Sequence, residues 1–185
     1  MDSLRNPYTP NAGAAPEVIV GRDDQTKSFE ALLHRLAQGR SEQSMIITGL
    51  RGVGKTVLLG RFREIALGAR WEVIEFEASK HDEDRFRQVM ATQLRAALLR
   101  LSPRARWSER GRHAGAVLSA FAVTAAPDGS WTLNWDVPPA QGHADHGELG
   151  LDLADVFVAL GEAAEEQKRG IAMLIDEVQF LKPVQ

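Results

Sequence analysis

Apolar residues in the first third of the chain predict two helices that flank a short strand. Asp23 or Asp24 is expected to cap the first helix, because the apolar residues that follow recur at i, i+3, i+4 and i+7. They are Phe29, Leu32, Leu33 and Leu36. The apolar run over Ser44–Thr48 is typical of a strand buried on both faces of a parallel sheet. A second helix is predicted over residues 55–67.

Alternating and continuous apolar patterns predict two further strands. The residues of Trp71–Glu77 alternate, and with the strand and helix before them they predict a right-handed parallel βαβ unit. Helical spacing then predicts a third helix over 79–101 and a last helix over 153–164. The apolar run Ile171–Ile175 predicts a third buried strand. The pattern as a whole favours an α/β fold with a parallel sheet.

The middle of the chain interrupts this alternation of helices and strands. Alternating apolar residues on either side of Pro127-Asp128-Gly129 predict a β-hairpin near residues 117–137, inside an insertion over 102–150. Residues 1–17 are rich in Pro, Asn, Gly and Ala and are expected to form an extended N-terminal segment. The domain itself is expected to span 18–185.

Composition and charge exclude several classes of protein. Apolar residues make up 44% of the chain and charged residues 25%, which is typical of a folded globular protein. The net charge of -3 is too small to predict binding to nucleic acid or to an anionic membrane. The chain has no cysteine, so disulfides and thiolate metal sites are excluded, and we expect a cytoplasmic protein. No signal peptide or membrane span is predicted.

A glycine-rich segment between the first predicted strand and the second predicted helix matches G-x-x-x-x-G-K-[ST]. Its glycines allow backbone N–H groups to face a phosphate, and the helix that follows adds the positive end of its dipole. Lys55 would reach the β- and γ-phosphates, and the Thr56 hydroxyl would bind Mg²⁺. The segment therefore predicts a site for ATP and Mg²⁺ formed by Gly49, Leu50, Arg51, Gly52, Val53, Gly54, Lys55 and Thr56.

Two acidic residues follow the third predicted strand. Asp176 would hold Mg²⁺ through a bound water, and Glu177 would orient or deprotonate the water that attacks the γ-phosphate. A glutamate beside the aspartate favours ATP hydrolysis over phosphoryl transfer to a second substrate. Lys55 and Glu177 are the candidate catalytic residues, and Thr56 and Asp176 are the candidate metal ligands.

With these motifs the chain resembles the AAA+ group of P-loop ATPases, in particular its origin-recognition-like branch and bacterial relatives. Four segments carry the resemblance, namely Val20-Gly21-Arg22-Asp23, Gly49–Thr56, the strand with Asp176-Glu177, and Val178-Gln179-Phe180-Leu181. The resemblance implies a three-layer α/β/α P-loop fold. It also implies that Val20 and Gly21, together with Ile19, contact the adenine base.

The resemblance sets expectations for the rest of the domain as well. Related domains continue with a sensor strand, a fifth strand, an arginine finger and a helical lid. We expect the chain to be an N-terminal fragment that stops after the acidic strand, binds nucleotide and shows little catalysis alone. Such a stop would leave the edge of Ser44–Thr48 unpaired, which favours association.

Three functions remain open at this point. The first is an ATP-hydrolysing switch that binds ATP and ADP and self-associates through the full-length protein. The second is a DNA-associated ATPase, similar to initiators or transposition helpers, and the third is a nucleotide-dependent signalling scaffold without hydrolysis.

A basic cluster could bind DNA phosphates or a neighbouring subunit's nucleotide, or form a solvated loop: Arg100, Arg104, Arg106, Arg110 and Arg112, with Trp107 and His113. A polar loop contains side chains of the types that bind metals, namely His143, Asp145, His146 and Glu148. It has no histidine pair at the helical spacing i, i+4, which argues against a metal site.

Overall fold

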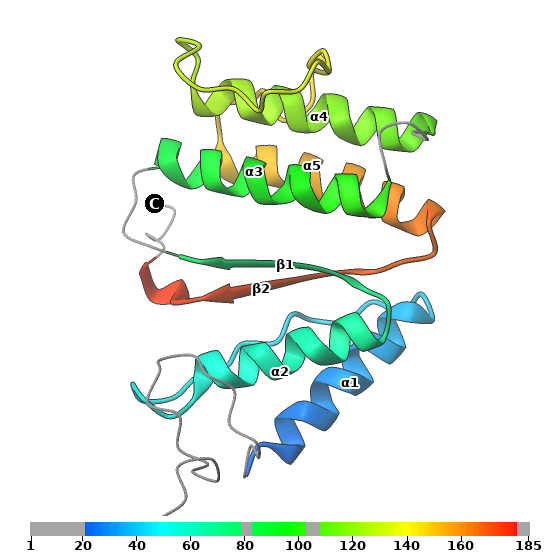
Figure 1. Cartoon of the computed structure of the whole chain (residues 1–185), viewed down its shortest axis with the longest axis vertical. Helices are drawn as coiled ribbons and strands as arrows, with labels where there is room; N and C mark the ends of the chain where they lie inside the picture. Colours follow the sequence, from blue (N-terminus) through cyan, green and yellow to red (C-terminus); the bar gives the residue numbers. More distant parts are fainter. Residues whose placement is uncertain (1–20, 79–82, 103–107, 181–185) are drawn as a thin grey trace, which may run out of the picture. The chain divides into compact units, whose positions relative to one another are not determined.

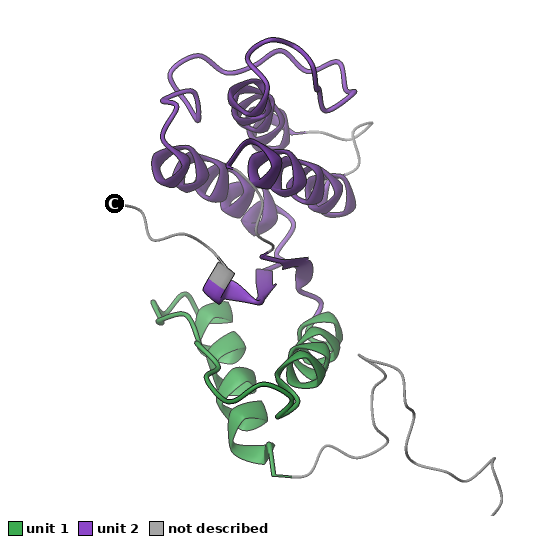
Figure 2. Ribbon diagram, turned by 90° about the vertical axis from the view of Figure 1, so that its left-hand side faces the viewer, with its two compact units in different colours: residues 1–69 green, residues 70–185 purple. Residues whose placement is uncertain are grey.

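A computed structural model describes residues 21–78, 83–102 and 108–180 of the chain. The chain divides into two compact units, Met1–Ala69 and Arg70–Gln185, which are coloured separately in Figure 2. The predicted extended segment over residues 1–17 lies outside the described residues. The first unit carries the glycine-rich segment, and the second carries the two acidic residues.

Two helices form the described core of the first unit. They are α1, Asp23–Ala37, and α2, Lys55–Gly68, and they confirm both helices predicted for this region. The expected cap at Asp23 or Asp24 is wrong, because Arg22 is the N-cap of α1 and both aspartates lie in its first turn. The Phe29 ring on α1 stacks on the Phe62 ring on α2, with 4.2 Å between ring centroids and 8° between ring planes. Side chains from both helices are buried around this contact: Phe29, Leu33, Leu58, Phe62 and Ala66.

The predicted strand over Ser44–Thr48 is wrong. The backbone there is not in a strand, and the Ile46 side chain is 79% exposed. An apolar run favours burial, but a strand also needs a neighbouring strand that accepts its hydrogen bonds. Among the described residues, the strands are β1, Glu72–Glu77, and β2, Ile171–Asp176, which pair with each other. The predicted βαβ unit through α2 is therefore not formed.

β1 and β2 form a parallel pair, which confirms the two other predicted strands. Their register runs from Glu72 opposite Ile171 to Glu77 opposite Asp176. Parallel strands need a long crossover connection, and α3, α4 and α5 lie within it (Figure 1). Because the strands are parallel, both carboxyl ends lie at the same edge of the sheet. A 3₁₀ helix, Val178–Phe180, follows β2 at that edge.

The three crossover helices build the core of the second unit. They are α3, Glu83–Leu101, α4, Glu109–Ala125, and α5, Leu149–Glu166. α3 packs against β1, and α4 packs against both α3 and α5 (Figure 1). α3 and α5 confirm the predicted third and last helices, although Ser79, the predicted start of the third, lies outside the described residues. The largest buried apolar side chains include Ile74, Leu94, Leu98, Leu118, Phe121 and Leu160.

The predicted β-hairpin near 117–137 is also wrong, because its first half belongs to α4. Buried residues recur there with helical spacing, at Ala114, Val117, Leu118, Phe121, Ala122 and Ala125. Ser108 caps the helix by accepting a hydrogen bond from the Gly111 N–H at 3.1 Å. The alternating residues over 131–137 form no strand. Leu133 is nevertheless buried in the core, and the Trp135 Nε1–H donates to Ser119 Oγ at 2.8 Å.

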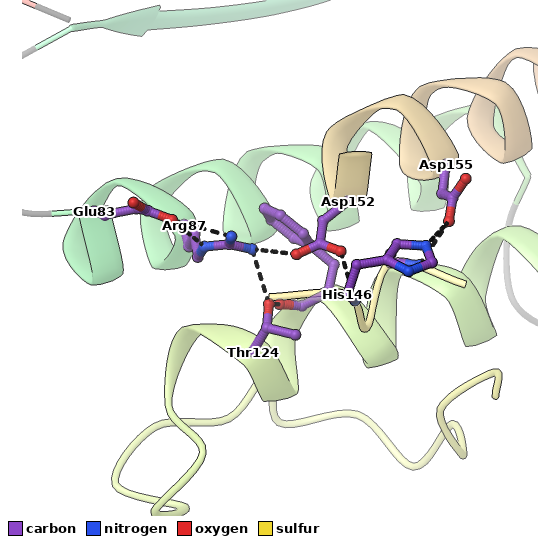
Figure 3. Close-up of polar contacts among 8 residues, drawn as sticks. Glu83, Arg87, Thr124, His146, Asp152 and Asp155 are labelled. Atoms are coloured by element: carbon purple, nitrogen blue, oxygen red, sulfur yellow. Dashed lines mark hydrogen bonds and ion pairs between the residues drawn. The ribbon is translucent and has the colours of Figure 1, made fainter. Parts of the chain in front are cut away.

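A buried ion pair joins the three helices of the second unit (Figure 3). Arg87 on α3 donates from Nη1 to Asp152 Oδ2 on α5 at 2.8 Å and to Thr124 Oγ1 on α4 at 3.0 Å. Its Nε donates to Glu83 Oε1 at 3.1 Å, whereas Nη2 lies 3.0 Å from that oxygen without the alignment of a hydrogen bond. The other Asp152 oxygen accepts the His146 N–H at 2.9 Å. Both charged groups, the Arg87 guanidinium and the Asp152 carboxylate, therefore have several hydrogen-bond partners inside the core.

Asp155, one turn further along α5, makes stability depend on pH. The Ala144 N–H donates to its Oδ2 at 2.8 Å, and the His146 Nε2 lies 3.2 Å from the same atom. The Ala144 hydrogen bond, aided by His146, lowers the pKa of Asp155 below its ordinary value of 3.8. A lowered pKa means that the ionised carboxylate stabilises the fold above about pH 4 and loses this effect as the pH falls through the folded-state pKa.

The Asp155→Asn variant is therefore expected to be less stable than the wild type at pH 7, by about 0.5–1 kcal/mol for this partly exposed site. The difference should be smaller at pH 3 than at pH 7, because the carboxyl of the unfolded chain is largely protonated at pH 3. Urea unfolding can be followed by tryptophan fluorescence, because all four tryptophans belong to the second unit: Trp71, Trp107, Trp131 and Trp135. An equal difference at both pH values would contradict the role of the ionised carboxylate.

Candidate functional site

The glycine-rich segment of the first unit leads directly into α2. Gly52 and Gly54 have φ values of 81° and 80°, in the left-handed region that other residues rarely adopt, and Gly54 is the N-cap of α2. Gly49 has a φ of 157°, which L side chains also rarely adopt, and a Cβ there would lie 3.1 Å from the Val53 Cγ2. Glycine at these positions therefore follows from the shape of the loop as well as from the motif.

The Lys55 side chain folds over the loop that precedes it. Its Nζ donates hydrogen bonds to the carbonyl oxygens of Gly49, at 3.0 Å, and Leu50, at 2.9 Å. Both acceptors are neutral, whereas a phosphate oxygen carries charge and forms a stronger hydrogen bond with an ammonium group. Lys55 can therefore exchange these carbonyls for an anionic ligand at the loop. Thr56 follows in the first turn of α2.

The N-terminus of α2 is suited to bind an anion. No side chain caps it, and its first turn contains no acidic residue. Each of the other four described α-helices has at least one acidic residue in its first turn: Asp23 and Asp24 in α1, Glu83 and Asp84 in α3, Glu109 in α4, and Asp152 in α5. The partial positive charge of the α2 terminus is thus left for a ligand. Loop, lysine and helix together fit a phosphate group.

The segment predicted to contact adenine is connected to this loop through Arg22. Gly21, with φ 75°, lies just before α1, while Ile19 and Val20 lie outside the described residues. The Arg22 Nη2 donates to the Val53 carbonyl oxygen at 2.7 Å. The sequence pattern alone assigns no role to Arg22, although this residue stands in one of the four segments that carry the family resemblance.

The acidic pair of the second unit stands at the carboxyl edge of the sheet. Asp176 ends β2, and its Oδ1 accepts the Glu177 N–H at 2.8 Å. Glu177 has φ 55°, a left-handed conformation that costs a non-glycine residue about 1–2 kcal/mol. Such conformations persist where the surrounding structure holds them, often at functional sites.

Two residues at this edge were missed by sequence reasoning. The Gln179 Nε2 donates to Glu177 Oε2, so an amide side chain orients the candidate catalytic carboxylate. Glu77 lies opposite Asp176 in the strand register. The available signal for Glu77 was that it ends one predicted strand just as Asp176 ends another, and parallel strands bring such ends together.

The arginine cluster is partly neutralised within the fold. Arg100 forms an ion pair with Glu72, and Arg110 forms one with Glu165 at 2.9 Å. Arg104, Arg106 and Trp107 lie outside the described residues. Cations already paired with carboxylates are poor ligands for DNA phosphates, so the described part of the cluster does not favour a DNA-binding role.

The histidine-containing loop shows no metal site among the residues that the structure covers. The His113 and His143 rings meet edge to face, with 5.3 Å between centroids. No group of three or more histidine and carboxylate side chains is arranged to hold a metal ion within residues 21–78, 83–102 and 108–180. The described helices also include none that is long and apolar enough to cross a membrane.

The glycine loop, Lys55 and the unneutralised α2 terminus are the features of a P-loop nucleotide-binding domain. The chain belongs to the AAA ATPase domain family, whose model matches residues 18–184. This membership implies a P-loop α/β fold and an AAA-type, nucleotide-binding ATPase. No curated protein and no solved structure matches the chain.

Proposed function

We propose that the chain binds ATP with Mg²⁺ at its phosphate loop, defined as Gly49–Thr56, and hydrolyses ATP as a molecular switch within the full-length protein. The observation that carries this proposal is the N-terminus of α2, which has neither an acidic residue in its first turn nor a side-chain cap. A glycine-rich loop precedes it, and the Lys55 Nζ donates a hydrogen bond to the Gly49 carbonyl oxygen of that loop. The nucleotide-binding domain would span residues 18–185, with 102–150 as an insertion and 1–17 as an extended segment.

Each predicted site residue has a distinct role in this proposal. The backbone N–H groups of Gly49–Gly54 and the α2 terminus bind phosphate oxygens, and Lys55 neutralises the β- and γ-phosphates. Thr56 and Asp176 supply oxygen ligands suited to Mg²⁺, which neutralises further phosphate charge when bound. Val20 and Gly21, with Ile19, contact the adenine base, as the resemblance implies. The four matching segments support the origin-recognition-like branch of the family.

The proposed reaction is an in-line displacement by water. Glu177 accepts a proton from the water as its oxygen forms a bond to the γ-phosphorus. The bond from that phosphorus to the β,γ-bridging oxygen breaks, and ADP leaves with the bonding electron pair. Loss of the γ-phosphate removes negative charge from the loop, which gives the two nucleotide states different contacts and supports a switching role.

Binding at the loop is tested with the Lys55→Ala variant. Its affinity for MgATP is expected to fall about 100-fold, or ~2.7 kcal/mol, because charge-assisted hydrogen bonds to the phosphates are lost. Isothermal titration calorimetry measures the change. Lys27→Ala is the matched control, since Lys27 is an exposed lysine on α1 of the same unit and its loss should leave the affinity unchanged. Equal MgATP affinity in the wild type and Lys55→Ala would refute the proposed site.

A further inference from the structure

The contact between Arg22 and Val53 connects the N-cap of α1 to the part of the phosphate loop that contains two glycines. Val53 stands between Gly52 and Gly54, and neither glycine has a Cβ to restrict its backbone. The Val53 side chain itself is 41% exposed. The Arg22 Nη2 donates to the Val53 carbonyl oxygen at 2.7 Å, so a donor 31 residues away holds this segment.

The backbone of Arg22 is itself well anchored. Arg22 is the N-cap of α1, and its carbonyl oxygen accepts the Thr26 N–H at 3.0 Å. α1 in turn packs on α2 through the stacked rings of Phe29 and Phe62. The guanidinium group therefore extends from a fixed point of the same unit to the loop, and it can transmit that rigidity to the Val53 carbonyl.

The geometry of the peptide bond links this carbonyl to phosphate binding. The chain has no cis peptide bond in its described residues, so the Val53–Gly54 peptide is trans and planar. In a trans peptide the carbonyl and the next N–H point in opposite directions. A donor that holds the Val53 carbonyl on one side therefore fixes the Gly54 N–H on the other side, at the start of α2.

We propose that Arg22 is a positioning residue that orients the Val53–Gly54 peptide so that the Gly54 N–H is available to a phosphate oxygen. The inference rests on the proposed function, because it assumes that a nucleotide binds at the loop. It assigns Arg22 to recognition of the phosphates, in contrast to the adenine contact expected of its neighbours Val20 and Gly21. Arg22 acts through the backbone of the loop and requires no contact with the base.

The test compares ligands with and without a base. Arg22→Met keeps the apolar stem but removes every donor, and Arg22→Lys restores one donor and the charge. Calorimetry gives the affinities of each variant for MgATP and for Mg-bound inorganic triphosphate, which lacks adenosine. Arg22→Met is expected to weaken both ligands by the same factor, about 10-fold, the effect of one lost hydrogen bond. Arg22→Lys should recover most of this loss, and Lys27→Ala should show none.

Several results would overturn the inference. A loss of affinity confined to MgATP would show that Arg22 contacts the base. Unchanged affinity for both ligands would show that the Val53–Gly54 peptide is oriented without Arg22. Loss of the helical circular dichroism signal in Arg22→Met would show that Arg22 holds the fold of the first unit and has no specific effect on the loop. If the wild type binds neither ligand, the proposed function itself fails. This outcome is distinguished from a failure of the role of Arg22, which appears only in the variants.

Discussion

The Glu177→Gln variant of the full-length protein is expected to hydrolyse ATP about 1,000-fold more slowly than the wild type, while its MgATP affinity stays within about twofold. Glutamine has the size of glutamate and an oxygen that can still accept a hydrogen bond from Gln179, but it cannot take the proton of the attacking water. Turnover is measured as phosphate release, and affinity is measured by calorimetry on the same preparations.

Glu162→Gln provides the matched control, because Glu162 is exposed on α5 and undergoes the same chemical change. It should turn over ATP at the wild-type rate. Wild-type turnover in Glu177→Gln would show that another group activates the water. Tight ATP binding without any hydrolysis by the wild type would favour the signalling scaffold over the ATP-hydrolysing switch.

The Asp152→Ala variant is expected to lower the free energy of unfolding of the second unit by about 3–5 kcal/mol. Asp152 is fully buried, and Arg87 is 2% exposed, so removal of the carboxylate leaves a charged guanidinium in the core without its partner. The loss should exceed that of most single substitutions, since the same carboxylate also accepts the His146 N–H. Urea unfolding monitored by tryptophan fluorescence reports on this unit.

Two comparisons separate the cost of an unpaired charge from a general effect of mutation. Glu165→Ala breaks the exposed ion pair with Arg110 and should cost less than about 1 kcal/mol. Combining Asp152→Leu with Arg87→Met removes both charges, and the double variant should be much more stable than Asp152→Ala. A loss below about 1 kcal/mol in Asp152→Ala would contradict the role of the buried pair.

Local sequence patterns predicted most of the described helices and both described strands. α1, α2, α3 and α5 follow from apolar residues at helical spacing, since one helix face must be buried wherever the helix packs. β1 and β2 follow from an alternating and a continuous apolar run. The phosphate loop follows from the spacing G-x-x-x-x-G-K-[ST], which lies within eight consecutive residues.

The two wrong predictions share one cause. Ser44–Thr48 has the composition of a buried strand, and residues 121–125 alternate like one, but a strand exists only through hydrogen bonds to another strand. In α4 the helical spacing of small and apolar residues from Ala114 to Ala125 outweighs the short alternation. Ladder pairing is a tertiary property, so the local pattern could not decide it.

The sequence by itself determined the buried faces of α1, α2, α3 and α5 and the positions of β1 and β2, and it predicted the candidate nucleotide-binding residues, because each of these depends on spacing within one segment. The sequence also contains a signal for a buried ion pair, since Arg87 and Asp152 both stand on otherwise apolar helix faces. Only the tertiary structure decided that these two charges meet, and that Arg22 holds the Val53 carbonyl. These contacts join residues 65 and 31 positions apart, and their geometry depends on how the helices pack.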